Sequence, residues 1–376
     1  HYVAMGKIPD KAEIIIQGGT FTFFPKAYQE YFVKYALKAM NDFSRLFFDN
    51  GELDMLKFKK FFELPRLVLG EDKRTEKVHK KLLHIKNLDL NDLEARKNTE
   101  NLFFNGFNGF LDNLKAFNAL KNQRFLGHQK CEAFFSASGE LENSKRNEIN
   151  EPQQKQEVNF IENRDQDADI LAVKNLQIKL KSENNPNFTL KQIQKENETA
   201  LIRCVGLTIE TKSDFGKLYH GNLMLELGCT RVEIGVQSIY DNVLEATNRG
   251  NTVSDNIESI RILKDLGFKI NTHYMPGLPL TTKEMDLNGL MQLFESPDYR
   301  PDMLKIYPCM VMEGTKLYDD WKAGKFIPLT TKEAAEIIAE AKIFVPKWIR
   351  VMRVQRDIPS YITSAGVDRT NLRQYV

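Results

Sequence analysis

Short apolar runs alternate with amphipathic helical patterns in two parts of this 376-residue chain. Runs of this length are typical of buried strands, and the patterns between them repeat every three to four residues, as helices do. Thr252–Asp255 and Thr330–Glu333 are capping boxes, which mark the starts of two helices. Strands alternating with helices form βαβ units with a parallel sheet. The sequence therefore predicts an α/β protein, and so few units favour a partial (β/α) barrel over a doubly wound sheet, although periodicity alone does not decide. The predicted strands are 13–17, 203–210, 231–235, 268–274 and 303–307.

Residues 44–200 interrupt this alternation. Helical patches are predicted at 55–62, 78–85 and 111–120, and from 136 to 198 the composition is dominated by Asn, Gln, Glu and Lys. Such a composition buries too little apolar surface to offset the entropy lost on ordering. We therefore expect a long insertion that is helical at first and then disordered. The predicted segments are 1–43 (first part of the barrel), 44–200 (insertion), 201–346 (rest of the barrel) and 347–376 (the start of a basic C-terminal extension).

Composition and charge exclude several classes of function. With 53 basic and 51 acidic residues the net charge is +2, so bulk charge does not indicate a polyanionic partner. No apolar run has the roughly 18 residues of a membrane span, and no signal-peptide pattern opens the chain, so we predict a cytoplasmic protein without a membrane partner. The ends, His1 and Val376, favour a chain cut from a longer protein. The four cysteines lack zinc, redox or cluster spacing, so no metal site is predicted within this chain: Cys131, Cys204, Cys229 and Cys309.

Polar groups follow the predicted strands, which is where a barrel places its ligand-binding groups. Gly18, Gly19 and Thr20 offer bare backbone to a small polar ligand, or they form a simple turn. Glu210 can bind a ribose hydroxyl or an ammonium group, or it caps a helix. Gln237, beyond the next strand, has the same two alternatives. They predict a polar site at one edge of the sheet.

Three further residues extend this candidate site. Arg249 can bind a carboxylate or phosphate, although surface arginines are common. His273 precedes a loop stiffened by Pro276 and Pro279, yet a lone strand histidine is more often a core residue. Lys305 lies inside a strand, where a charge is costly unless it lines a polar cavity. Lys305 is the candidate catalytic residue, and one alternative is an unrelated barrel lyase or aldolase in which it forms a Schiff base.

The C-terminal part carries basic residues around an aromatic one. Lys347, Arg350, Arg353 and Arg356 occur with Trp348 and without an acid from 346 to 356. Basic and aromatic side chains together suit phosphate and base contacts, whereas the alternative is a solvated edge.

Taken in order, these segments resemble the catalytic subunit of Elongator in its archaeal, single-protein form. The resemblance implies a radical S-adenosylmethionine (radical SAM) barrel joined to an acetyltransferase domain. It further implies that a [4Fe-4S] cluster cleaves S-adenosylmethionine to a deoxyadenosyl radical, and that a carboxymethyl-type group from acetyl-CoA is added to C5 of the wobble uridine of tRNA. The segments that carry the resemblance are 17–21, 208–211, 227–238, 247–250, 275–279, 301–308 and 353–359.

The resemblance also assigns residues to ligands. The implied partners are tRNA and acetyl-CoA, and a homodimer is left open. Gly18, Gly19 and Thr20 would receive the methionine amine of S-adenosylmethionine. The residues implied to line or shape its pocket are Glu210, Gln237, Arg249, His273, Pro276 and Gly277. Those implied to face tRNA or acetyl-CoA are Lys305, Tyr307, Lys347, Arg350, Arg353 and Arg356.

Departures from the family pattern leave two hypotheses open: part of an active enzyme, or a non-catalytic tRNA-binding or assembly module. The cluster cysteines would precede Ile14 and the acetyltransferase domain would follow Val376, so this chain by itself is expected to be inactive. The family's Glu-Thr-Arg-Pro-Asp reads Glu-Thr-Lys-Ser-Asp over 210–214, and Asn251 replaces the usual histidine.

Overall fold

The computed structural model describes residues 2–64, 73–104, 187–355, 362–369 and 371–376. The chain divides into two compact units, which we call the barrel unit (His1–Ser44 and Leu176–Val376) and the insertion unit (Arg45–Asn175).

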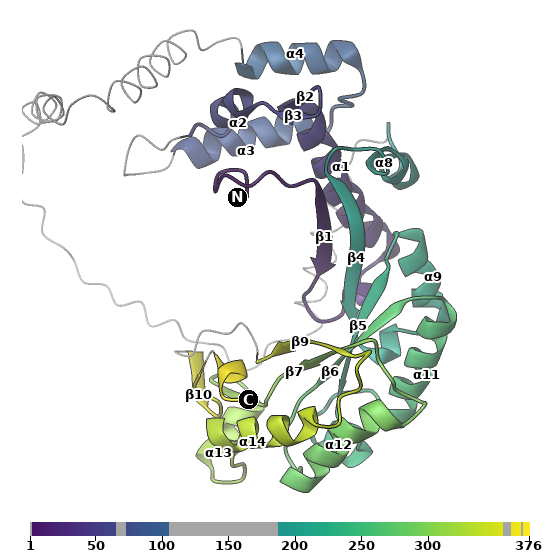
Figure 1. Cartoon of the computed structure of the whole chain (residues 1–376), viewed down its shortest axis with the longest axis vertical. Coiled ribbons are helices and arrows are strands. Elements are labelled where there is room, and N and C mark those ends of the chain that lie inside the picture. The colour runs from purple at the N-terminus through teal and green to yellow at the C-terminus, as the bar shows by residue number, and fades with distance from the viewer. Residues whose placement is uncertain (1, 65–72, 105–186, 356–361, 370) are drawn as a thin grey trace, which may run out of the picture. The chain divides into compact units, whose positions relative to one another are not determined.

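The barrel unit is built on a curled, six-stranded sheet (Figure 1). Every pair of neighbouring strands is parallel, in the order β1-β4-β5-β6-β7-β9. The predicted α/β fold and partial barrel are therefore confirmed. The strands are β1 (Lys11–Ile16), β4 (Arg203–Thr211), β5 (Arg231–Gln237), β6 (Lys269–Tyr274), β7 (Met303–Ile306) and β9 (Arg350–Val354).

Helices pack on one face of this sheet because alternate strand residues are apolar. In β5, Val232, Ile234 and Val236 join the main hydrophobic core, whereas Glu233 and Gln237 point to the opposite face. Buried residues of each covering helix belong to the same core. These helices are α1 (Lys26–Phe47), α9 (Leu218–Glu226), α11 (Val253–Asp265), α12 (Lys283–Glu295) and α14 (Thr331–Lys342).

Both predicted capping boxes are present at the starts of α11 and α14. The hydroxyl of Thr252 accepts from the backbone N–H of Asp255, and Thr330 does the same with Glu333. After α11, Gly267 adopts the left-handed conformation at φ +87°. The remaining elements of the unit are η1 (Phe21–Phe23), α8 (Leu190–Asn197), η2 (Ser213–Phe215), α10 (Asp241–Ala246), β8 (Val311–Met312), α13 (Lys316–Lys322), β10 (Thr363–Ala365) and η4 (Leu372–Gln374).

Helix α8 lies where composition predicted the disordered end of the insertion. Phe188 and Ile193 are 6% and 4% exposed and belong to the main core. Asn41 of α1 donates to the carbonyl of Ile193 at 3.1 Å, and Asn197 donates to Asn41 Oδ1 at 2.6 Å. Two well-spaced apolar residues and two buried amides thus order a segment whose average composition is polar.

The two outer strands, β1 and β9, differ from the predictions, one in its burial and the other in its place in the fold. Residues 350–354, expected in a C-terminal extension, form β9 and pair with β7, so the sheet continues beyond residue 346. Strand β1 was expected to be buried, yet Ile15 is 40% exposed because β1 is the first strand in the sheet order.

The insertion unit has a small aromatic core. The rings of Phe47 and Phe61 lie 5.4 Å apart, and Phe58 and Phe104 also contact Phe47. The helices predicted at 55–62 and 78–85 are present, whereas the patch at 111–120 and the residues 136–186 lie outside the described residues. The elements are β2 (Phe48–Asp49), β3 (Glu52–Leu53), α2 (Met55–Phe61), α3 (Lys73–Lys86) and α4 (Leu93–Phe104). Within the described ranges of both units, the helices are too short or too polar to cross a membrane.

Candidate functional site

The predicted pocket residues meet at the carboxyl edge of the sheet. Gly18 and Gly19 follow β1, whereas Glu210, Gln237 and His273 lie at or near the ends of β4, β5 and β6. Because these strands are parallel neighbours, their carboxyl ends share one edge. The fold therefore brings together residues that are far apart in the sequence.

A buried carboxylate, Glu233, is the centre of this edge. One of its oxygens accepts a hydrogen bond from Asn271 Nδ2 at 3.1 Å. The other contacts His273 Nε2 at 3.1 Å and accepts from Lys305 Nζ. Burial opposes the charged form of Glu233, but the hydrogen bonds from His273 and Lys305 outweigh it and lower its pKa to about 2. Glu233 is thus an anion with both oxygens occupied.

His273 connects this buried centre to Glu210. Its Nδ1 lies 3.8 Å from Glu210 Oε1, on the opposite side of the ring from Glu233. The ring of Tyr307 packs edge-on against the imidazole, with 5.3 Å between centroids. Side chains of four strands therefore form one continuous polar network, in the order Glu210, His273, Glu233 and Lys305.

Sequence reasoning missed Glu233 and Asn271. A usable signal was present, since Glu233 is an acid inside an apolar strand, as Lys305 is a base inside another. A buried lysine needs a compensating anion, so each of the two residues predicts the other. The sequence did not show that Lys305 of β7 reaches Glu233 of β5 across the intervening strand β6.

Gln237 and Arg249 lie together over Gly235. Gln237 is in the left-handed region at φ +65°, and its Oε1 is buried without a hydrogen-bond partner in the described part of the chain. Arg249 Nη2 donates to the carbonyl of Gly235 at 3.2 Å. A Cβ on Gly235 would lie 2.5 Å from Arg249 Nη2 and 2.9 Å from Gln237 Nε2. A glycine is therefore needed for both side chains to cover this strand.

We expect Gly235→Ala to disturb ligand binding more than stability. The added methyl would displace the flexible ends of Arg249 and Gln237, costing about 1 kcal/mol of unfolding free energy or less. Because the family resemblance implies that these two side chains line the S-adenosylmethionine pocket, moving them should weaken binding of this ligand by about tenfold, measured by equilibrium dialysis. Gly206→Ala, in the neighbouring strand β4, is the control because its Cβ would make only ordinary contacts, the nearest at 3.5 Å. Equal losses of binding in the two variants would contradict the assignment.

The Gly18-Gly19 turn leaves its backbone open. Both glycines are exposed, with φ values of +131° and +91°, and a Cβ at either position would contact nothing within 4 Å. Backbone conformation, not crowding, therefore requires glycine here, and a ligand can approach the peptide groups. Thr20 follows and is partly buried.

The loop after β6 is held by Asp286 of α12. The N–H of Gly277 donates to Asp286 Oδ2 at 2.7 Å, and the Thr281 hydroxyl donates to the same oxygen at 3.3 Å. Pro276 and Gly277 are both buried. Burial raises the pKa of Asp286 to about 6, and the hydrogen bonds to its charged form only partly oppose this.

Asp286 should make stability fall between about pH 4 and pH 6. The folded protein retains the proton that the unfolded chain releases near the ordinary pKa, so the stabilisation present at low pH is lost as pH rises through the folded pKa. Relative to Asp286→Asn, the wild type should lose up to about 1.4 kcal/mol per pH unit across this window, then level off. Urea unfolding at several pH values measures the difference, with the exposed Asp298→Asn as control. A wild-type stability that rose with pH relative to Asp286→Asn would refute the assignment.

Three of the family departures lie side by side. Ser213 Oγ and Asn251 Nδ2 both hydrogen-bond to Asn256 Oδ1. Lys212 Nζ donates to the carbonyl of Arg249 at 3.0 Å and pairs with Asp214 at 3.0 Å. Ser213 and Asn251 therefore share one acceptor on Asn256, and Lys212 ties the backbone of the 247–250 segment to the end of β4.

The residues implied to face tRNA or acetyl-CoA do not all lie on the surface. Lys305 and Tyr307 are 3% and 6% exposed, because both join the Glu233 network instead. Lys347 and Arg350 are exposed, and Arg353 is partly buried in β9. Arg356 lies outside the described residues.

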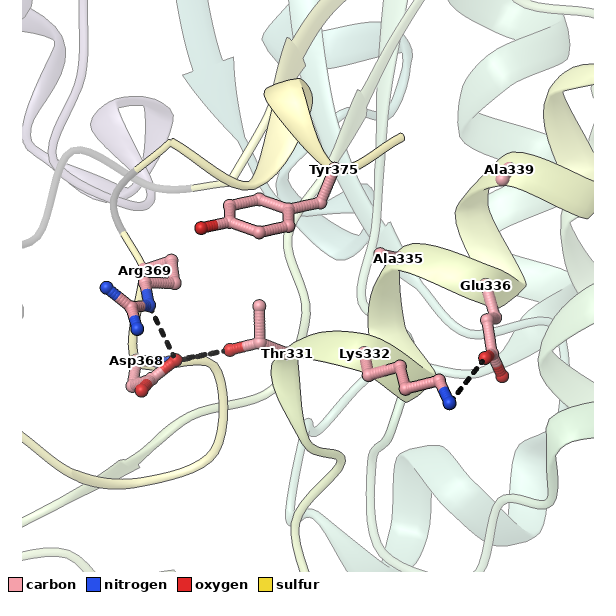
Figure 2. Close-up of a pocket in the computed structure, with 8 residues that line it drawn as sticks. All are labelled: Thr331, Lys332, Ala335, Glu336, Ala339, Asp368, Arg369 and Tyr375. Carbon is pink, nitrogen blue, oxygen red and sulfur yellow. Dashed lines mark hydrogen bonds and ion pairs between the residues drawn. The ribbon is translucent and has the colours of Figure 1, made fainter.

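A separate pocket of about 440 Å³ lies between α14 and the C-terminal segment (Figure 2). Asp368 accepts from the Thr331 hydroxyl and lies 3.8 Å from Arg369, while Tyr375 borders the pocket from the chain end. Its lining residues are distinct from the carboxyl-edge residues, and we do not place the candidate site there.

Among the described residues, the side chains of the candidate site suit a polar organic ligand and not a metal ion. The described residues include no group of three or more His, Cys, Asp or Glu that could hold a metal ion. Cys229 is buried, which raises its pKa to about 12, and Cys131 lies outside the described residues. The buried acceptors Gln237 Oε1 and Asn271 Oδ1 have no partner within the described ranges. With Glu210 and the open glycines, they fit a polar ligand that carries an amine and hydroxyl groups.

Comparison with known families agrees with this arrangement. Residues 183–287 match the radical SAM superfamily, and residues 301–376 match the radical SAM C-terminal domain. The barrel unit is similar to a radical SAM domain over these two ranges. Its strands β4 to β7 and β9 fall almost entirely within the two matched ranges.

Curated relatives confirm the resemblance of this chain to Elongator catalytic subunits. It is 50% identical over 188 residues to a tRNA uridine(34) acetyltransferase of Methanocaldococcus jannaschii, covering 50% of this chain and 35% of the relative. It is 47% identical over 180 residues to Elongator complex protein 3 of Mus musculus, covering 48% and 33%. The solved Methanocaldococcus infernus Elp3 with an N-terminal deletion is 45% identical, covering 54% of this chain and 49% of that one, with a TM-score of 0.49. The matched part thus spans about a third of the curated relatives.

These findings do not favour the lyase or aldolase alternative. A Schiff-base lysine needs a free amine that the substrate can reach. In this radical SAM domain Lys305 is 3% exposed and paired with Glu233.

Proposed function

We propose that this chain is the S-adenosylmethionine-binding part of an enzyme that modifies the wobble uridine of tRNA. The observation that carries the proposal is the meeting of Glu210, Gln237 and His273 at the carboxyl edge of a radical SAM barrel. The names of the most similar relatives, tRNA uridine(34) acetyltransferase and Elongator complex protein 3, support the substrate.

Within this function, the chain's own residues bind and orient S-adenosylmethionine. The open backbone at Gly18 and Gly19, with Thr20, receives its methionine amine. Glu210 faces an ammonium or ribose hydroxyl, and the orphaned Gln237 Oε1 accepts a hydrogen bond from the ligand. Arg249 lies close to Gln237 and is suited to the methionine carboxylate.

The complete protein would add a carboxymethyl-type group from acetyl-CoA to C5 of the uridine. A [4Fe-4S] cluster with S-adenosylmethionine supplies a deoxyadenosyl radical when both are bound, and the cluster ligands would come from outside the described residues. The chain's contribution is to hold S-adenosylmethionine in the half-barrel.

Lys347, Arg350, Arg353 and Arg356, with the exposed Trp348, are proposed to contact tRNA, or the phosphates of acetyl-CoA. The enzyme would then work where tRNA is present, which we predict to be the cytoplasm. A homodimer remains a proposal without a described interface.

The test uses the protein expressed with its flanking coding sequence and reconstituted anaerobically with iron and sulfide. With acetyl-CoA and a tRNA transcript, we expect release of deoxyadenosine and a mass increase at uridine 34, both lost in Glu210→Ala. Binding of tRNA without cleavage of S-adenosylmethionine would instead support the non-catalytic module.

A further inference from the structure

The network of Glu210, His273, Glu233 and Lys305 is unbalanced in charge. It contains two carboxylates and one ammonium, so without a proton added to His273 it carries one surplus negative charge. Lys305 contacts Glu233 directly, which neutralises the buried carboxylate. The surplus charge therefore belongs to Glu210.

The residue that carries the surplus charge is also the most exposed of the four. The side chains of Glu233 and Lys305 are 0% and 4% exposed, and His273 is 3% exposed. Glu210 is the accessible member, at 23%. A cationic ligand entering the half-barrel would consequently meet the uncompensated carboxylate and not the buried ion pair.

We propose that Glu233 is a positioning residue that, by compensating Lys305 and orienting His273, reserves the negative charge of Glu210 for the sulfonium cation of S-adenosylmethionine. This inference rests on the proposed S-adenosylmethionine site. It adds a residue that contacts no ligand yet decides how strongly the site prefers a cationic one.

The alternatives to this role are limited by geometry. Both oxygens of Glu233 are occupied by Asn271, His273 and Lys305, so Glu233 has little capacity left to bind a ligand itself. Its carboxylate instead holds Nε2 of the imidazole, and Nδ1 of the same ring approaches Glu210. A change at Glu233 thus reaches the pocket through His273 and through the charge of Lys305.

Substitutions can change the network charge in both directions. Glu233→Gln removes one negative charge and leaves the Lys305 ammonium to offset Glu210, so the network becomes neutral. Lys305→Met makes it more negative, by one charge. The double variant Glu233→Gln/Lys305→Met returns it to the wild-type charge with two uncharged side chains of similar size.

The experiment measures dissociation constants of S-adenosylmethionine and S-adenosylhomocysteine for each full-chain variant by equilibrium dialysis. The two ligands differ in the sulfonium charge, so the ratio of their affinities reports the electrostatic preference. We expect Glu233→Gln to reduce this preference by about tenfold, Lys305→Met to raise it, and the double variant to restore it to within about threefold of wild type. Glu295→Gln, an exposed acid on α12, is the control.

A merely structural role predicts a different pattern, with both ligands weakened alike and the preference unchanged. That result in Glu233→Gln, or a double variant with as low a preference as Glu233→Gln, would overturn the inference. If one single variant does not fold, the other still decides, because the charge argument requires a lower preference in Glu233→Gln and a higher one in Lys305→Met, and an unchanged preference in either contradicts it. Failure of the wild type to bind either ligand would instead overturn the proposed function.

Discussion

Lys305→Met is expected to destabilise the folded protein by about 3–5 kcal/mol, because it leaves Glu233 charged and buried without its ammonium partner. Glu233 is completely buried, and the Lys305 ammonium forms an ion pair with it. Methionine has a similar length but cannot donate a hydrogen bond. Chemical unfolding at neutral pH, followed by circular dichroism, measures the loss.

Two variants make this result specific to the ion pair. The double variant Glu233→Gln/Lys305→Met should be more stable than Lys305→Met, because it removes the orphaned charge. Lys269→Met tests the same replacement at a lysine that is 68% exposed in its surface pair with Asp302, where a much smaller loss is expected. If Lys305→Met proved as stable as Lys269→Met, the buried pair would not contribute as argued.

Gly289→Ala should cost about 3 kcal/mol through overpacking between α12 and β6. An added Cβ would overlap Tyr274 Oη and lie 2.8 Å from Tyr274 Cζ. Tyr274 is fully buried and its hydroxyl contacts Asp286 at 3.4 Å, so the ring has little space to move. In an exposed helix the same replacement would stabilise by about 1 kcal/mol, so a loss would identify the packing as its cause.

Tyr274→Phe provides the matched background for this prediction. Without the hydroxyl the closest overlap disappears, while contacts to the ring carbons remain. Gly289→Ala should therefore cost about half as much in Tyr274→Phe as in the wild type, as measured by the thermal midpoint and urea unfolding. An equal cost in both backgrounds would place the strain elsewhere.

Local patterns in the sequence were reliable where one short segment decided the outcome. The apolar runs predicted β4 to β7 to within a few residues, and the capping boxes predicted the starts of α11 and α14. The side chains at strand ends were correctly expected at one edge, because parallel strands share a direction. Their individual roles toward S-adenosylmethionine remain predictions.

Averaged composition was less informative than the spacing of single residues. It placed residues 187–200 in a disordered segment, whereas Phe188 and Ile193 anchor α8 in the core. The strand-like, basic residues 347–356 were assigned to an extension beyond the barrel, whereas residues 350–354 form the outer strand β9 of its sheet. The backbone hydrogen bonds of β9 are made with β7, and they form regardless of the charges on the side chains of β9.

The sequence by itself determined the βα alternation, the helix starts and the family motifs, since each depends on residues a few positions apart. Only the tertiary structure decided that Glu233 compensates Lys305, that His273 contacts both Glu233 and Glu210, and that Asn256 receives hydrogen bonds from both Ser213 and Asn251. These contacts join different strands and loops. Burial makes each of them energetically necessary, but the identity of the partner follows from strand order and register, which no local pattern contains.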